Sequence, residues 1–335
     1  MPFDLHGRLI YRLRSFLLLL WVSVLVTVAR LRHGPRLSAW TWSLESATTF
    51  LRLQERVAFG LSTIAEQREY TDALVFRSPA LVHVQIEAVE APSVKGRWFV
   101  PHTARDEDVV LYLHGGGYAF SARAHDNLIA LVALAAQART FALDYPLTPE
   151  HPFPAQLQDA QVAYHWLLSR GIAPQHIVVA GDSAGGNLAL ALLLALRDGQ
   201  QPLPRLAVCL CPWTDMDSSY TSLKGNEPYD WVERRMVVQW AEWFCQRTEP
   251  ENPLVSPVHA DLRGLPPIYI QAGEAEILID MIRTFAHKAK EQGACVSLEV
   301  WKQMNHDFQA YGTTMQQSKE ALQRIGEVIQ QVSVA

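Results

Sequence analysis

The sequence Gly-Asp-Ser-Ala-Gly at residues 181–185 most constrains what this chain can fold into. It follows the apolar run 177–180 and precedes a run with the composition of a helix, 187–192. A strand that turns sharply into a helix needs small residues beside the turn, because neighbouring backbones pass closely there. The pattern therefore predicts a buried strand followed by a helix, with Ser183 at the turn as a candidate nucleophile.

A second glycine-rich segment lies upstream. The apolar strand predicted at 108–113 leads directly into His-Gly-Gly-Gly-Tyr at 114–118. Consecutive glycines weaken a strand, but they allow a backbone to approach a ligand and to present its N–H groups. Donors of this kind stabilise the oxyanion that develops during acyl transfer. We expect the N–H groups of Gly116, Gly117 and Ala184 to form such an oxyanion hole.

A serine nucleophile needs a base, and the base needs a carboxylate that orients it. The strand predicted at 267–272 leads to Glu276, and the strand predicted at 296–301 leads to His306. Sheets of this kind carry their sites at the carboxyl ends of the strands. The chain order serine, acid, histidine is the one that accompanies a Gly-x-Ser-x-Gly turn. The sequence therefore predicts Ser183, Glu276 and His306 as the catalytic residues.

Segments typical of strands and helices alternate along most of the chain. This alternation predicts an α/β fold with a mainly parallel sheet and helices on both faces. The interval 213–254 breaks the rhythm, and its aromatic-rich helical stretch 231–247 indicates a cap over the pocket. The expected strands are 81–87, 96–100, 108–113, 140–143, 176–180, 206–211, 267–272 and 296–301, and the expected helices include 125–136 and 155–169.

These motifs resemble those of the hormone-sensitive-lipase family, the α/β-hydrolase esterases marked by His-Gly-Gly-Gly. The resemblance runs from about residue 75 to the C-terminus and includes 144–154. It implies an α/β-hydrolase fold with a helical cap, and a carboxylesterase for short- to medium-chain esters that needs no metal or organic cofactor. We expect Tyr118, Asp182 and Trp213 to line the substrate pocket. The expected parts are an apolar helix (1–36), the N-terminal part of the cap (37–75), the catalytic domain (76–212 and 255–335) and a cap insertion (213–254).

The chain departs from the family pattern at the acid. The family's Asp-Pro-Leu followed by Asp corresponds here to Glu-Ile-Leu-Ile-Asp at 276–280. Two acids are therefore candidates, Glu276 and Asp280. We favour Glu276, because it lies in the loop after the strand, whereas Asp280 falls inside the next predicted helix. His306 is followed by Asp307 where the family often has glycine.

Other functions are compatible with the same fold. An amide-cleaving or deacetylating hydrolase would use the same residues. A receptor such as the plant gibberellin receptor uses the pocket but has lost the catalytic histidine. The chain has Ser183, Glu276 and His306, which favours the enzyme. Its net charge of −5 gives no reason to expect nucleic acid as a partner. The expected partner is a small-molecule ester, and a homodimer is an open alternative.

Two cysteines, Cys209 and Cys211, are expected to share a strand and to point to the same face. No matching second pair of ligands follows them. This indicates buried free thiols rather than a metal site.

The N-terminal residues 15–29 contain no charged side chain. The run is shorter than the about 20 apolar residues of a spanning helix. We favour a membrane anchor over a cap-docking helix of a cytoplasmic protein. A cleaved signal peptide is the third alternative, and the sequence at 30–32, Arg-Leu-Arg, is a poor cleavage context for it. The run is flanked by Arg8, Arg12 and Arg14 on one side and by Arg30, Arg32 and Arg36 on the other.

Overall fold

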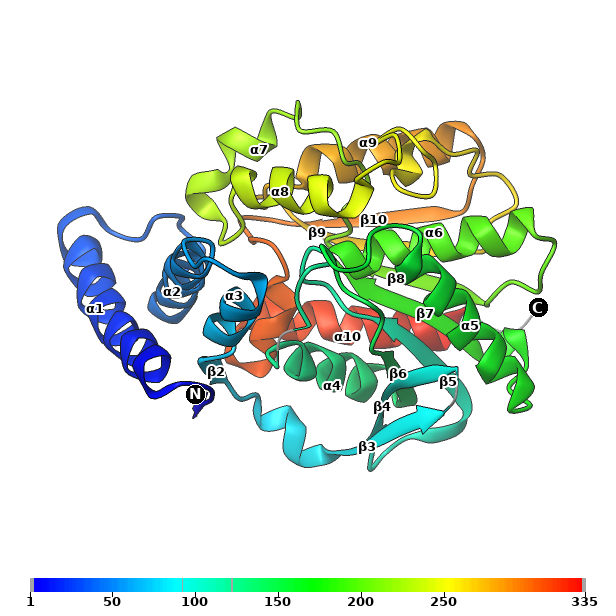
Figure 1. The fold of residues 1–335 in the computed structure, drawn as a ribbon, viewed down its shortest axis with the longest axis horizontal. Coiled ribbons are helices and arrows are strands. Elements are labelled where there is room, and N and C mark those ends of the chain that lie inside the picture. The colour runs from blue at the N-terminus through cyan, green and yellow to red at the C-terminus, as the bar shows by residue number, and fades with distance from the viewer. Residues whose placement is uncertain (1–2, 92, 122, 333–335) are drawn as a thin grey trace.

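The computed structural model describes residues 3–91, 93–121 and 123–332, which build a central sheet between two layers of helices (Figure 1). The strands of this sheet are β3 (Val84–Ala91), β4 (Val94–Pro101), β5 (Arg105–Leu113), β6 (Ala138–Leu143), β7 (Ile177–Asp182), β8 (Leu206–Leu210), β9 (Ile268–Gly273) and β10 (Val296–Trp301). Within the described residues the strand order is β10-β9-β8-β7-β5-β6-β4-β3. β4 is antiparallel to both of its neighbours, and the remaining pairs are parallel. The predicted mainly parallel sheet is confirmed.

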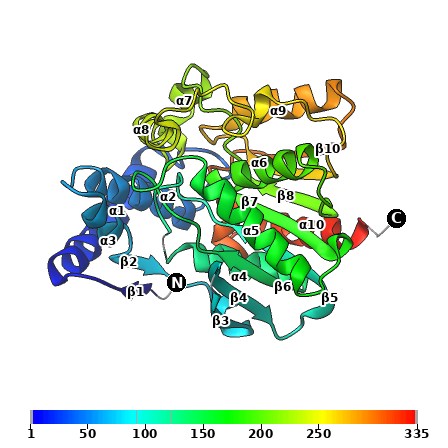
Figure 2. The same cartoon turned by 45° about the vertical axis from the view of Figure 1, so that its right-hand side comes forward.

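Helices cover both faces of the sheet (Figure 2). Successive side chains of a strand point to opposite faces, so β5 supplies both layers. Leu111 packs with the α5 and α6 layer, whereas Val110 and Tyr112 pack with α4 and α10. The helices of the two layers are α4 (His125–Ala136) and α10 (Gln316–Gln331) on one face, and α5 (Ala155–Ser169), α6 (Ala184–Asp198) and α9 (Ile279–Glu291) on the other.

The chain before this core forms a separate layer at one side (Figure 1). Its elements are β1 (Phe3–Leu5), α1 (Leu9–His33), α2 (Trp42–Ala58), α3 (Ile64–Thr71) and β2 (Leu74–Phe76). β1 pairs with β2 in antiparallel register, and α1 packs on α2. The insertion after β8 adds α7 (Ser222–Gly225) and α8 (Arg234–Cys245). Phe59, which ends α2, places its ring centroid 5.8 Å from that of Trp240 in α8, so the two parts of the predicted cap meet.

Several predicted bounds differ from the structure. The stretch expected to be helical at 231–247 forms α8 only over Arg234–Cys245, and the strands expected at 96–100 and 140–143 each begin two residues earlier. The strand predicted at 81–87 begins only at Val84, because Pro79–His83 form a 3-10 turn. The strand predicted at 206–211 ends at Leu210, and Cys211 follows it with a φ of 45°. Cys209 packs in the main core, whereas Cys211 packs with Met304 and Phe308 near the C-terminal end of the sheet. The prediction that both cysteines share one strand face is therefore wrong.

Candidate active site

Ser183 lies at the sharp turn between β7 and α6. Its backbone φ of 53° and ψ of −118° fall in a region that residues other than glycine rarely adopt. Two hydrogen bonds hold the turn: its N–H donates to the carbonyl of Leu210 at 2.8 Å, and its carbonyl accepts from the N–H of Trp213 at 3.0 Å. A Cβ at Gly185 would overlap the carbonyl oxygen of Leu113, which explains the glycine after the turn. Strain of this kind persists where surrounding structure enforces it, as at nucleophile turns.

Glu276 and His306 are brought together by the loops that follow β9 and β10. His306 Nδ1 is 3.5 Å from Glu276 Oε1, and both side chains are buried. The other carboxylate oxygen of Glu276 accepts a hydrogen bond from the N–H of Gly273 at 2.7 Å, which fixes the carboxylate. Asp280 lies in the first turn of α9 and accepts hydrogen bonds from Thr221 Oγ1 and the N–H of Ser222. Of the two candidate acids, Glu276 is the one beside the imidazole.

Asp230, which precedes α8, connects the loops of the acid and the base. Its Oδ2 accepts a hydrogen bond from the N–H of Ile277 at 2.7 Å, and its Oδ1 accepts from the N–H of His306 at 3.4 Å. Trp231 adds a second connection, because its indole Nε1–H donates to the carbonyl of His306 at 3.0 Å. Asp230 is fully buried. Sequence reasoning missed it, because a lone aspartate far from the motifs carries no recognisable pattern.

The charge of His306 depends on the carboxylates around it. Burial disfavours the imidazolium, but Asp307, Glu276 and Asp230 outweigh this effect and raise the pKa of His306 to about 10. Asp307 Oδ2 lies 3.4 Å from His306 Nε2. Burial also raises the pKa of Asp230 to about 6, against the opposing effect of His306. For Asp307, burial raises the pKa well above its usual range, against the opposing effect of His306.

The glycine loop after β5 adopts conformations that suit glycine. Gly116 and Gly117 have φ values of 94° and 60°. A Cβ at Gly117 would overlap the indole of Trp240, so α8 packs directly on the loop. Among the described residues, the N–H groups of Gly116, Gly117 and Ala184 have no hydrogen-bond acceptor. Free N–H groups in a largely buried loop are rare, because water cannot satisfy them. They are the donors expected of an oxyanion hole.

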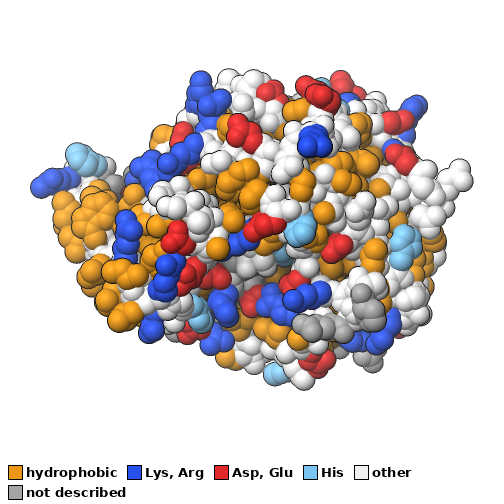
Figure 3. Space-filling view, in the orientation of Figure 1, with side chains coloured by type: hydrophobic (Ala, Val, Ile, Leu, Met, Phe, Trp, Pro, Cys, Tyr) orange, Lys and Arg blue, Asp and Glu red, His pale blue; other side chains and the backbone are white. Residues whose placement is uncertain are grey.

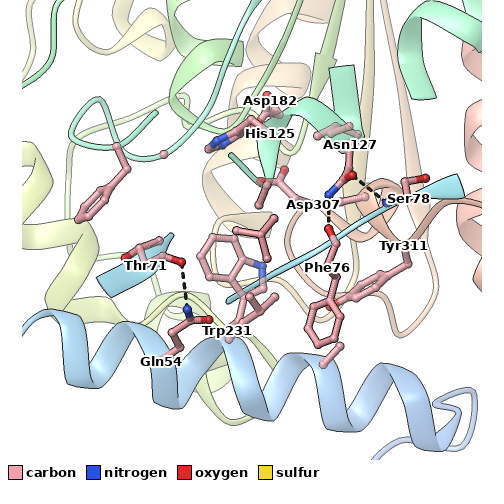
Figure 4. A pocket seen from close by; sticks show the side chains of 18 of the residues that line it. Gln54, Thr71, Phe76, Ser78, His125, Asn127, Asp182, Trp231, Asp307 and Tyr311 are labelled. Carbon is pink, nitrogen blue, oxygen red and sulfur yellow. Dashed lines mark hydrogen bonds and ion pairs between the residues drawn. The ribbon is translucent and has the colours of Figure 1, made fainter. Parts of the chain in front are cut away.

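A cavity of about 190 Å³ lies between α2, β2 and the catalytic loops (Figure 4). Asp182 and Asp307, which are the chain neighbours of Ser183 and His306, both contribute to its wall, together with Gly116. His125 Nε2 is 3.7 Å from Asp182 Oδ2 at this end. The remaining wall is mainly apolar and includes Ala47, Leu51, Leu74, Phe76, Leu128, Trp231 and Trp240.

The structure brings only one of the three expected pocket residues to this cavity. Asp182 lines it, whereas Tyr118 and Trp213 do not. The ring of Tyr118 stacks on Phe244 with centroids 3.9 Å apart, and its hydroxyl donates to Asn187 Oδ1 at 2.6 Å. Trp213 is buried, and its carbonyl accepts from the same amide. Tyr118 and Trp213 therefore both bind the side chain of Asn187 in α6 and support the packing around this helix. The walls from α2 and β2 come largely from the segment 37–75, which was expected to form the N-terminal part of the cap, although their individual residues were not predicted.

Cys211, Glu276 and His306 have potential ligand atoms within 4.8 Å of one another. Metal binding requires a thiolate, but burial, helped by Glu276, raises the pKa of Cys211 well above its usual range. Its Sγ also accepts a hydrogen bond from the N–H of Asp307 at 3.4 Å. Cys211 is therefore a buried thiol held beside the imidazole and the carboxylate.

Comparisons with known proteins place this chain in a family. Residues 110–310 match a family model described as an alpha/beta hydrolase fold. An acetyl-hydrolase of Streptomyces hygroscopicus is 40% identical over 233 residues, which are 68% of this chain and 77% of that protein. An esterase of Acinetobacter venetianus is 32% identical over 263 residues, which are 78% of this chain and 86% of that protein.

Solved structures agree. A mutant of the esterase E40 superposes with a TM-score of 0.79 at 38% identity and covers 84% of this chain and 97% of its own. An esterase from the bacterial hormone-sensitive lipase family has a TM-score of 0.73 at 32% identity, over 98% of this chain and 100% of its own.

Proposed function

Since this chain belongs to the hormone-sensitive-lipase family of α/β-hydrolases and is a serine carboxylesterase, we propose that it cleaves short- to medium-chain esters with a triad of Ser183, His306 and Glu276. The predicted fold, family and enzyme class are confirmed; the triad and the chain length belong to the proposal. The observation that carries it is the 3.5 Å approach of His306 Nδ1 to Glu276 Oε1. Asp182 and Asp307, the chain neighbours of Ser183 and His306, line the adjacent cavity.

In the proposed reaction, the Ser183 hydroxyl attacks the ester carbonyl as His306 Nε2 takes its proton. Glu276 accepts the Nδ1–H hydrogen bond and stabilises the imidazolium. The imidazolium then returns the proton to the departing alcohol. Water attacks the acyl-enzyme in the same way, so that the acid leaves and Ser183 regains its proton. These steps need no metal or organic cofactor.

The negative charge of the tetrahedral intermediate falls on the former carbonyl oxygen. We assign its stabilisation to the N–H groups of Gly116, Gly117 and Ala184, which have no acceptor among the described residues. Each preorganised donor of this kind is worth about 3–4 kcal/mol in the transition state. The close packing of Trp240 on Gly117 supports the assignment, because it holds the loop in place.

The cavity supports the proposed chain length. Its volume of about 190 Å³ is below the about 300–1,000 Å³ of pockets for drug-sized ligands. Its mainly apolar wall suits an alkyl chain, since burial of each methylene contributes about 0.8 kcal/mol.

A series of p-nitrophenyl esters from acetate to laurate tests the proposal. We expect the highest kcat/KM below the ten-carbon ester and a fall towards laurate. Ser183→Ala should lower the turnover by at least about 10⁴-fold, while Ser169→Ala, at an exposed helix end, serves as the matched control. An optimum at laurate would contradict the proposed acyl-chain length. An active Ser183→Ala enzyme would contradict the assignment of Ser183 as the nucleophile.

The acetyl-hydrolase relative supports a narrower second candidate, the removal of acetyl groups. Release of acetate from acetylated alcohols and amides, measured beside butyrate release from matched esters, distinguishes the two.

We also propose that the apolar segment 15–29 attaches the enzyme to a membrane. The alternative location is the cytoplasm, and the alternative association is a homodimer. α1 is long and apolar enough to cross a membrane, by length and composition.

A further inference from the structure

The outer face of α1 is apolar along its whole length. Leu17, Leu20 and Val24 are 63%, 50% and 64% exposed. The exposed apolar positions recur every three or four residues, which places them on one face of the helix. Figure 3 shows them as an orange surface that ends in basic side chains. The exposed apolar residues of α1 are Leu9, Ile10, Leu13, Leu17, Leu20, Trp21, Val24, Leu25, Val28 and Leu31.

The inner face of α1 is bound to the rest of the protein. Val22 and Val26 are buried in a cluster with Phe50 of α2 and Leu74 of β2. Tyr11 packs edge to face on Tyr70, with ring centroids 5.3 Å apart. The helix therefore has two apolar faces with different partners, one already covered by protein and one uncovered.

Both ends of α1 are attached to the same part of the protein. At the start, β1 pairs with β2 and Arg8 Nε binds Glu69 Oε2 at 2.8 Å. At the end, Arg30 Nη1 binds Glu45 Oε2 at 2.7 Å. A spanning helix must place its two ends on opposite sides of about 30 Å of hydrocarbon. With both ends held by the same folded unit, α1 can lie in the plane of a membrane surface but cannot cross it.

The charges of α1 decide between a membrane and a second copy of the chain. The helix carries no acidic residue; Arg12 and Arg14 lie near its start and Arg32 near its end, whereas Arg30 is already paired with Glu45. Two copies that met on this face would place arginines against arginines, in parallel and in antiparallel arrangements alike. Like charges at such positions oppose association. Anionic lipid headgroups complement both ends at once.

We propose that α1 is an interfacial docking helix that lies flat on an anionic lipid bilayer and inserts its outer face among the acyl chains. The proposal deepens the membrane attachment proposed above and does not depend on the ester cleaved. α2, whose Phe50 packs on α1, also lines the cavity through Ala47 and Leu51. Docking therefore places the substrate cavity one helix layer from the lipid.

Vesicle flotation of the full chain tests the proposal. The folded protein is mixed with vesicles of phosphatidylcholine alone, or with about 30% phosphatidylglycerol, to which basic residues are attracted. We expect at least about tenfold more protein to float with the anionic vesicles, and about 0.5 M salt to release much of it. Equal binding to both vesicles, or none, would overturn the proposal.

Variants locate the contact. Leu17→Glu with Leu20→Glu should lower the vesicle-bound fraction at least about tenfold, because it introduces charges into the inserted face. Arg14→Gln with Arg32→Gln should reduce the preference for anionic vesicles. The matched control, Val82→Glu with Ile86→Glu, changes two exposed apolar residues outside α1 and should bind as the wild type does.

Two further measurements separate the alternatives. Hydrolysis of soluble p-nitrophenyl butyrate should stay within about twofold in the Leu17/Leu20 variant, since these side chains are exposed and lie outside the catalytic loops. Sedimentation without lipid should give a monomer for both proteins. A wild-type dimer that the same variant converts to monomer would show that a second copy covers the face, and would overturn the lipid assignment.

Discussion

Replacement of Asp307 by asparagine should shift the pH dependence of the enzyme towards acid. The carboxylate of Asp307 lies 3.4 Å from His306 Nε2, the atom that must accept the serine proton. A negative charge there favours the imidazolium, which cannot act as a base. A raised pKa of His306 therefore places the acid limb of kcat/KM at a higher pH than a free imidazole would. Asparagine keeps the shape and removes the charge.

The distance sets the size of the effect. At 3.4 Å and an effective dielectric constant of about 20, a full charge on Asp307 would stabilise the imidazolium by about 5 kcal/mol, or about 3.6 pKa units. This is an upper bound, because burial also raises the pKa of Asp307 and so opposes a full charge on its carboxyl. We expect the acid limb of kcat/KM to move down by about 1–2 pH units.

The assay is kcat/KM for a soluble butyrate ester from pH 5 to 10. Since the loss of a neighbouring carboxylate lowers the pKa of His306, Asp307→Asn should gain activity relative to the wild type on the acid side. Asp198→Asn, an exposed aspartate at the end of α6, is the control. An acid limb that stays within about 0.3 pH units of the wild type, or moves up, would refute the reasoning.

Other predictions concern the residues that orient the site. Glu276→Gln should lower kcat by about 10²–10⁴-fold, while Asp280→Asn, which only loses bonds to α7, should stay within about threefold; reversed results would reassign the acid. Asp230→Asn should lower kcat by about 10–100-fold, from one lost charge-assisted hydrogen bond, and should also lower the acid limb, which mere loss of stability would not do. Gly117→Ala should abolish turnover or folding, because the added methyl group would overlap Trp240. A variant with the turnover and the thermal unfolding midpoint of the wild type would contradict this prediction.

The elements of the core and the positions of the catalytic loops could be predicted from the sequence, because each depends on local patterns. Ser183 and His306 follow apolar strands, and the helices 125–136 and 155–169 have the predicted bounds. Asp307 has a φ of 52°, a conformation that favours glycine, which accounts for the glycine that the family often has there.

The remaining features depend on contacts between distant segments. Asp230 meets Ile277 and His306 only after the insertion has packed on the sheet. Cys211 leaves its strand because of a turn that its apolar neighbours do not reveal. The cavity walls of α2 and β2 come from a part of the chain without any catalytic motif. Pairwise packing over such separations leaves no periodic signal in one sequence.

The hydrogen bonds of Asp230 and Trp231 connect the 213–254 insertion directly to the loops that carry Glu276 and His306. If the 213–254 insertion swung away to admit substrate, it would withdraw the groups that hold the loops of Glu276 and His306. We therefore expect the insertion to stay in place during catalysis, so that the activity on soluble esters does not rise at an oil–water interface. Under the proposed function, the ester enters a cavity that is already formed, and docking of α1 on lipid would bring the substrate nearer without rearranging the catalytic loops.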